Sequence, residues 1–232
     1  MRPGTLAQVE SFWSTVLGVP KEKLFRGVSV AEHVGLSDYP GVVVVARDTG
    51  AHVSAPRPLL GAVTLRVQGA ALEALVSPAW WRRSLGEEYD VLGPSVHHYL
   101  DQDGALPAPR PVSRDRTLLT ELRAAVRDEE WAEAGFGEEP ETVFVATADG
   151  RPVAAANLTA FGPMLADVGV LTHPAHRGRG LGHAVAAVAV AHSLHENGLA
   201  RWRAREDNAP SLAVAARLGF EPWCRQLAVK PR

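Results

Sequence analysis

The chain has 232 residues, 46% hydrophobic and 22% charged, with a formal net charge of -2 at pH 7. These values exclude disorder as the main state, and the longest apolar stretches, Gly41–Ala46 and Ala184–Ala191, are far shorter than the roughly 20 residues that span a bilayer. The near-neutral charge argues against a nucleic-acid-binding surface. The single cysteine, Cys224, and the lack of an apolar leader predict a cytoplasmic protein.

The first hundred residues predict a mixed α/β region without a catalytic motif. Apolar residues recur on one helical face over Thr5–Leu17, and four successive valines in the strand Val42–Ala46 indicate burial on both faces. Of the neighbours Trp80 and Trp81, one indole is expected in the core and the other at its edge. The other predicted elements are a strand over Val28–Glu32, a hairpin partner over His52–Ala55, helices over Ala70–Val76 and Ala79–Leu85, an extended segment over Val91–Leu100, and Leu59–Val67, where strand and helix both stay open.

A segment rich in Pro, Gly and Ala, Asp101–Ser113, is typical of a linker. It predicts an N-terminal domain over residues 1–105 and a C-terminal domain over residues 106–232. The C-terminal elements expected in chain order are helices over Asp115–Arg127 and Glu129–Ala134, a β-hairpin of Thr142–Ala148 and Pro152–Ala160, a strand over Ala166–Thr172, a helix over Leu181–Asn197 stopped by Gly198, a strand over Leu199–Arg205, a helix that starts at Asn208 or Ser211 and ends before Gly219, and a strand over Trp223–Val229.

The informative segment is the turn between the strand ending at Thr172 and the helix starting at Leu181. It holds Gly178, Gly180 and Gly182, and such a turn presents backbone N–H groups to an anion at the positive end of a helix. The local prediction is a phosphate-binding turn. The segment lacks the Lys-Ser/Thr pair that a Walker loop requires. A Rossmann dinucleotide-binding turn is weakened by the G-x-G-x-G spacing but stays open. A tight strand–helix connection without a ligand also stays open.

The residues of this turn and its flanking strand and helix resemble the GNAT acyltransferase superfamily. Arg177-x-x-Gly180-x-Gly182 is similar to its acetyl-CoA pyrophosphate loop, and Val170-Leu171-Thr172-His173-Pro174 resembles the strand end before that loop. Asn208-x-x-Ser211, followed by Leu218-Gly219-Phe220, looks like the next helix of the family. The resemblance covers Ala108–Arg232 and implies a mixed, mostly antiparallel central sheet flanked by helices. The N-terminal α/β part would then be a degenerate GNAT-like half or an accessory domain.

The resemblance also implies roles for individual residues. The amides of Arg177, Gly178, Arg179, Gly180, Leu181 and Gly182 would hold the pyrophosphate. The backbone of Val170, Leu171 and Thr172 would pair with the pantetheine arm, and an N–H there would meet the thioester carbonyl as an oxyanion donor. Asn208 and Ser211 would lie beside the cofactor arm.

The sequence departs from the family at the position of its usual general acid. Many members carry a tyrosine there, whereas this chain has Ala215. The candidate acids and bases are instead Asp167, Glu206 and Tyr99, each weighed against a plain structural role. Asn157 and Thr159 are candidates for the acceptor pocket or ordinary polar residues. The family often has one strand more than Trp223–Val229, and the N-terminal part is expected to supply the missing sheet partner.

The resulting prediction is a GNAT-type N-acetyltransferase that moves an acetyl or short acyl group from coenzyme A directly to an amine. The alternative is a non-catalytic acyl-CoA-binding sensor or interaction module. The partners expected are acyl-CoA and an amine-bearing acceptor, with a homodimer left open and no nucleic acid or membrane. No metal is expected at His173, His176 and His183, because no cysteine lies near them and a phosphate-binding turn accounts for the segment.

Overall fold

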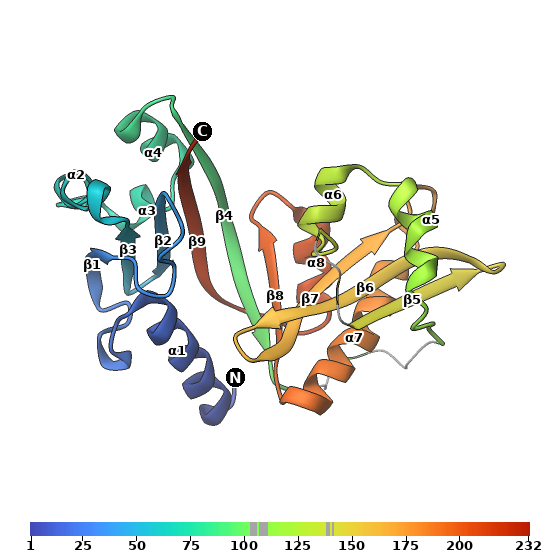
Figure 1. The fold of residues 1–232 in the computed structure, drawn as a ribbon. Coiled ribbons are helices and arrows are strands. Elements are labelled where there is room, and N and C mark those ends of the chain that lie inside the picture. Colours follow the sequence, from blue (N-terminus) through green and yellow to red (C-terminus); the bar gives the residue numbers. More distant parts are fainter. Residues whose placement is uncertain (103–105, 107–110, 138–139, 141) are drawn as a thin grey trace. The chain divides into compact units, whose positions relative to one another are not determined.

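The computed structural model describes residues 1–102, 106, 111–137, 140 and 142–232 (Figure 1). They form two compact units. The N-terminal unit comprises Arg2–His97, Ala204–Asn208 and Pro222–Arg232; the C-terminal unit comprises Met1, His98–Arg203 and Ala209–Glu221. Of the predicted linker, residues 103–105 and 107–110 lie outside the described residues. The domain boundary after residue 105 therefore stays a prediction.

The sheet of the N-terminal unit takes its strands from both ends of the chain. Its strands are β1 (Gly27–Glu32), β2 (Val42–Arg47), β3 (Gly50–Ala55), most of β4 (Tyr89–Leu100) and β9 (Glu221–Pro231), in the order β1-β3-β2-β9-β4. The predicted hairpin of β2 and β3 is confirmed, and β1 runs parallel to β3. β9 pairs antiparallel with β2, Val44 lying opposite Leu227. The N-terminal residues thus supply a sheet partner for the last strand, as expected.

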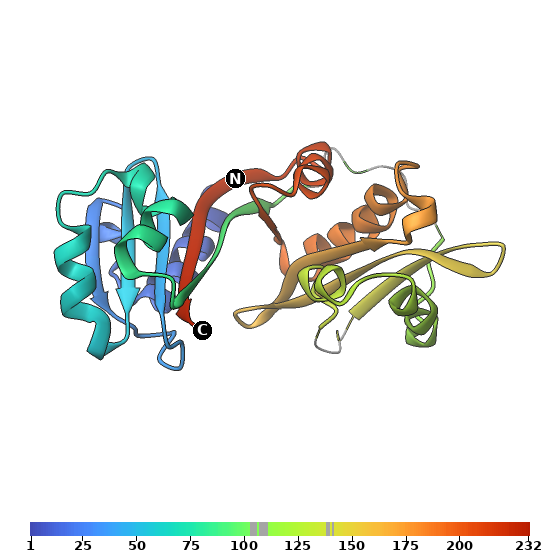
Figure 2. The ribbon, with the colours of Figure 1, turned by 90° about the horizontal axis from the view of Figure 1, so that it is seen from above.

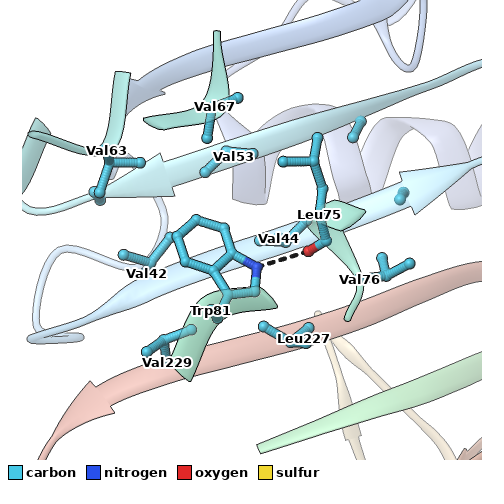
Figure 3. Packing of buried hydrophobic residues seen from close by; sticks show 13 residues of the cluster. Val42, Val44, Val53, Val63, Val67, Leu75, Val76, Trp81, Leu227 and Val229 are labelled. Atoms are coloured by element: carbon cyan, nitrogen blue, oxygen red, sulfur yellow. Dashed lines mark hydrogen bonds between the residues drawn. The ribbon is translucent and has the colours of Figure 1, made fainter. Parts of the chain in front are cut away.

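The helices of this unit are α1 (Pro3–Leu17), the 3-10 turn η1 (Lys21–Lys23), α2 (Arg57–Val67), α3 (Leu72–Leu75) and α4 (Pro78–Leu85). The segment that the sequence left open is a helix, α2, which starts with a proline in its first turn. Trp81 is fully buried among apolar residues of the sheet and of α2 and α3, and its Nε1 donates to the carbonyl of Leu75 at 2.7 Å (Figure 3). Trp80 is partly buried against the same cluster. The expected division between the two indoles is confirmed.

The C-terminal unit holds a second set of strands, β5 (Thr142–Ala148), β6 (Arg151–Phe161), β7 (Met164–Thr172) and most of β8 (Ala200–Arg205), in the order β8-β7-β6-β5. β5, β6 and β7 are antiparallel, and β8 runs parallel to β7. The helical elements are η2 (Arg116–Leu118), α5 (Leu119–Ala124), α6 (Asp128–Glu133), η3 (Pro174–His176), α7 (Leu181–Asn197) and α8 (Ala209–Arg217). Helix α7 covers one face of these strands, and α5 and α6 cover the other (Figure 2). The predicted fold class, a mixed and mostly antiparallel sheet flanked by helices, is confirmed.

The predicted helix over Asp115–Arg127 is wrong in length. The segment forms the 3-10 turn η2, the short helix α5 and then a turn. The guanidinium of Arg123 closes this turn, because it donates to the carbonyl of Val126 and pairs with Asp128 at the start of α6. The long helix α7 has the predicted bounds, and Gly198 ends it with a φ of +66°.

Candidate functional site

The candidate site begins where β7 ends. The imidazole of His173 accepts the N–H of Ala175 at 3.2 Å and so caps η3. Gly178 and Gly180 follow with φ angles of +76° and +75°, in the left-handed region that favours glycine. Gly180 is the N-cap residue of α7. The chain therefore passes from strand to helix with the free N–H groups of the first turn of α7 facing the loop, at the positive end of the helix dipole.

The three glycines of the loop do two different things. A Cβ atom at Gly178 or Gly180 would meet no atom within 4 Å, so the backbone there faces open space. A Cβ atom at Gly182 would lie 2.8 Å from Oγ1 of Thr172. The first two glycines leave the loop accessible to a ligand, whereas Gly182 lets α7 approach the end of β7.

Beyond the middle of β7, one edge of the strand is open. The N–H of His173 donates to the carbonyl of Val153 on β6 at 2.9 Å. Because backbone groups alternate in direction along a strand, the N–H and C=O of Thr172 and Val170 point away from β6. On that side β7 and β8 are paired through one residue pair, Asp167 and Arg201. Val170 and Thr172 thus offer backbone donors and acceptors to a further extended segment.

A β-bulge lies directly before the open edge. Thr159 of β6 lies opposite Asp167, but the next residue, Ala160, lies opposite Leu165. Ala166 is therefore the extra residue of the bulge. Bulges bend a strand and increase its twist, which explains why β7 turns away from β8 after Asp167.

An ion pair holds the last point of contact between β7 and β8. Nη1 of Arg201 donates to Oδ2 of Asp167 at 2.7 Å, and the two side chains are 9% and 15% exposed. The guanidinium also lies 4.8 Å from the ring centre of Phe161. The other carboxylate oxygen, Oδ1 of Asp167, is buried and has no hydrogen-bond partner among the residues that the structure describes. One oxygen of this carboxylate is structural, and the other is left for another donor.

Helix α6 packs against the face of β7 that helix α7 does not cover. A Cβ atom at Gly169 would overlap the carbonyl oxygen of Ala134, just past α6, and the amide oxygen of Asn157. Asn157 is fully buried; its Nδ2 donates to the carbonyl of Ala134 and its Oδ1 accepts the N–H of Gly169, both at 3.1 Å. This amide ties α6 to the strand, which explains Asn157 without a role in the acceptor pocket.

The two arginines of the loop have different surroundings. Nε of Arg177 donates to the carbonyl of Thr172 at 3.3 Å, and its Nη2 lies 3.2 Å from Oε1 of Glu130 on α6. The hydrogen bond from Arg177 is the largest influence on Glu130 and lowers the pKa of its carboxyl group. Arg179 is exposed and has no such partner within the described part of the chain. Arg177 is held by the protein, whereas Arg179 is available to a ligand.

The other predicted site residues lie outside β7 and the loop that follows it. Tyr99 is fully buried, with its ring 5.6 Å from that of Phe161. Glu206 and Asn208 belong to the N-terminal unit, where Glu206 pairs with Arg225. Ser211 on α8 accepts the indole N–H of Trp202 at 3.0 Å. Asp167, the end of β7 and the loop over residues 177–182 thus follow one another along a single strand and its loop.

Ala215 stands at the position where many members of the family carry a tyrosine. Ala215 on α8 is fully buried, and its methyl side chain has no proton to donate. In the described ranges, no group of three or more His, Cys, Asp or Glu side chains is arranged to hold a metal ion. No helix within the described residues has the length and apolar character needed to cross a membrane.

Three residues that shape the site were not predicted from the sequence: Arg201, Glu130 and, as a structural amide, Asn157. Arg201 carries no local signal of its burial, because its strand neighbours Ala200 and Trp202 point to the other face of the sheet. Glu130 gives no signal either. It lies 47 positions before Arg177 in the sequence, and its carboxylate looks like any exposed acid near a helix start.

Comparison with known proteins agrees with this geometry. The model of the Acetyltransferase (GNAT) family matches residues 109–220, which include β7, the loop, α7 and α8. The C-terminal part of the chain carries a GNAT domain. No protein of curated function matched the chain.

Two solved structures match nearly the whole chain. A protein described as a GNAT-family acetyltransferase from Novosphingobium aromaticivorans has a TM-score of 0.52 and 20% identity, over 94% of this chain and 96% of that one. An acetyltransferase from the GNAT family from Colwellia psychrerythraea also has a TM-score of 0.52, with 14% identity, over 100% of this chain and 98% of that one. At these identities the likeness concerns the fold, and it includes the N-terminal residues.

Proposed function

We propose that the GNAT domain transfers an acetyl or other short acyl group from coenzyme A directly to an amine. The observation that carries the proposal is the open edge of β7 immediately before a glycine loop that caps α7. An extended, amide-bearing arm followed by a pyrophosphate is a ligand with the right order of groups for such a strand and loop. The pantetheine and pyrophosphate of coenzyme A have this order.

The chain's own residues would hold the cofactor through the backbone. The outward N–H of Thr172 and the outward C=O of Val170 suit the amides of pantetheine, in the manner of an added strand. The N–H groups of residues 178–182 suit the pyrophosphate, because Gly178 and Gly180 leave open space and the helix dipole favours an anion. Leu171 pairs with Ala155 on β6 and its side chain is buried, so the proposal rests on Val170 and Thr172.

The same geometry supplies parts of the chemistry. The outward N–H of Val170 would donate to the thioester oxygen as negative charge develops on it, an interaction worth about 10²–10³ in rate in other acyl transfers. The amine nitrogen attacks the carbonyl carbon, the C–S bond breaks, and the carboxylate of Asp167, whose side chain is 15% exposed, accepts the amine proton through water. The thiolate takes a proton from solvent, because Ala215 offers none. No acyl-enzyme is needed, and Cys224 is a buried strand residue.

Glu206, Tyr99, Asn208 and Ser211 stay predictions, as do a cytoplasmic location and a homodimer. The acceptor amine is open among protein lysines, N-termini, antibiotics, polyamines and other small amines.

Binding and turnover test the proposal separately. Isothermal titration with coenzyme A and acetyl-CoA, with NAD as competitor, should show saturable binding that NAD does not displace. Release of coenzyme A thiol from acetyl-CoA is then followed against a panel of amines, with Cys224→Ser protein as the thiol background control. Binding without thiol release on any amine would support the sensor alternative, and no binding would refute the proposed site.

Asp167→Asn tests the assigned base. Its kcat should fall by about 10²-fold or more, while its affinity for acetyl-CoA stays within about twofold of that of the unmodified protein. Asp149→Asn is the matched control, since Asp149 lies in the exposed β5–β6 turn and asparagine tolerates its φ of +50°. An unchanged kcat in Asp167→Asn would remove the role, and the melting temperature shows whether the loss of the ion pair with Arg201 contributes.

A further inference from the structure

We infer that Glu130 is a positioning residue for the cofactor loop, and that Arg177 acts through Glu130 and Thr172 instead of as a direct phosphate ligand. This inference rests on the proposed coenzyme A site. It concerns how that site is held in shape, and it gives the two arginines of the loop separate roles.

Arg177 bridges three segments of the C-terminal unit. It starts in the loop, donates through Nε to the carbonyl of Thr172 at the end of β7, and pairs through Nη2 with Glu130 on α6. The carbonyl of Thr172 lies on the open edge of the strand. The Arg177 side chain therefore lies where the cofactor arm would meet the loop, in an orientation that Glu130 maintains.

Helix α6 is also attached at its other end. The carbonyl of Ala134, one residue past the helix, accepts the amide of Asn157, which in turn accepts the N–H of Gly169. Between the two attachments, Leu171 of β7 packs in the same cluster as Trp131 of α6. Glu130 and Asn157 thus connect α6 to β7 on both sides of Val170, so the helix acts as a brace for the stretch with outward amides.

The charges around Arg177 distinguish a positioning role for Glu130 from direct phosphate binding by Arg177. Oε1 of Glu130 lies 3.2 Å from Nη2 of Arg177 and 3.6 Å from Nη2 of Arg127. The nearer pair, Arg177 and Glu130, has no net charge and so adds little net attraction for an anion. Arg179 has no such partner among the described residues and keeps its full charge. If Glu130 acted by charge alone, its removal would strengthen binding of the anionic cofactor. If it positions Arg177, its removal weakens binding.

The test is a double-mutant cycle on coenzyme A affinity. Isothermal titration at several KCl concentrations compares Glu130→Ala, Arg177→Gln and their double variant with Arg179→Gln and the exposed neighbour control Glu129→Ala. We expect Glu130→Ala and Arg177→Gln each to weaken coenzyme A binding about two- to fivefold. The double variant should bind coenzyme A with about the same affinity as whichever single variant binds it less tightly. The affinity for coenzyme A should depend less on the KCl concentration in Arg179→Gln than in the unmodified protein, and should keep its full dependence in Arg177→Gln. Glu129→Ala should bind like the unmodified protein or slightly more tightly.

Equal or tighter binding by Glu130→Ala would overturn the inference, as would additive losses in the double variant. Melting temperatures identify a variant that fails to fold, and Glu130→Gln, which keeps the shape of the side chain, then replaces Glu130→Ala. Failure of the unmodified protein to bind coenzyme A would instead refute the proposed function, so the two outcomes are distinct.

Discussion

The strands β2 and β7, one in each unit, differ in how completely their backbone groups are paired. In the N-terminal unit, β2 pairs with β3 on one side and β9 on the other, and Val42–Val45 are buried on both faces. In the C-terminal unit, the described residues pair β7 with β8 at Asp167, and beyond it the outward N–H groups of Val170 and Thr172 have no strand partner in the described part of the chain. A strand with every group satisfied contributes stability, whereas a strand with unsatisfied backbone groups can bind another chain-like ligand. Substitutions should therefore affect stability in the first region and binding in the second.

Trp81→Ala should have the largest effect on stability. The side chain is fully buried and donates a hydrogen bond to Leu75, so its loss leaves a large cavity and an unpaired carbonyl. We expect the free energy of unfolding to fall by about 3–5 kcal/mol, measured by urea unfolding followed by circular dichroism. Trp80→Ala, at the partly buried edge, should cost less. The affinity of the folded variant for coenzyme A should not change, and a parallel loss of affinity would break the comparison.

His52 should make the N-terminal unit sensitive to acid. Burial, together with the nearby His33, lowers the pKa of His52 from 6.5 to about 4. Between these values the unfolded chain binds more protons than the folded protein, so stability falls as the pH drops from 6.5 toward 4. His52 alone should reduce the free energy of unfolding by about 2 kcal/mol between pH 7 and pH 5.

The measurement is urea unfolding at both pH values, and His52→Asn should lack this part of the pH dependence. Asparagine keeps an acceptor for Ser29, whose Oγ lies 2.9 Å from Nδ1 of His52. An identical pH dependence in the variant would show that other groups titrate.

Gly169→Ala should disturb the strand that carries the open edge. The added Cβ would overlap the backbone of Ala134, which cannot give way by a side-chain rotation. We expect a loss of about 1–3 kcal/mol in unfolding free energy, together with weaker coenzyme A binding. Gly61→Ala is the control in the other unit, because its Cβ meets no atom within 4 Å on helix α2. That variant should gain up to about 1 kcal/mol, and normal binding by Gly169→Ala would contradict the role of α6 as a brace.

Gly180→Ala should separate binding from stability most cleanly. Its φ of +75° costs an alanine about 1 kcal/mol, and no atom overlaps the new Cβ. Gly198 at the far end of α7 has a φ of +66° and equally open surroundings. Both variants should therefore melt at similarly reduced temperatures, while only Gly180→Ala loses coenzyme A affinity, by about tenfold. Equal affinities in calorimetry would show that the loop does not hold the phosphates.

Local sequence predicted the parts of the site that depend on neighbouring residues. The bounds of α7, the end of β7 and the turn glycines follow from helix periodicity, the Gly198 stop and the conformational freedom of Gly178 and Gly180. The predicted helix over Asp115–Arg127 failed because the contacts of Arg123 with Val126 and Asp128 close a turn there, and helical periodicity does not register such contacts.

The sequence by itself determined a mixed α/β chain and a phosphate-binding turn, because both are set by side-chain periodicity and by glycines within a few residues of each other. Only the tertiary structure decided that β9 pairs with β2, that Asp167 meets Arg201 at the last paired position of β7, and that Glu130 holds Arg177. These partners lie far apart along the chain and leave no local pattern. They are selected by the burial of charges and of backbone amides once the sheets form.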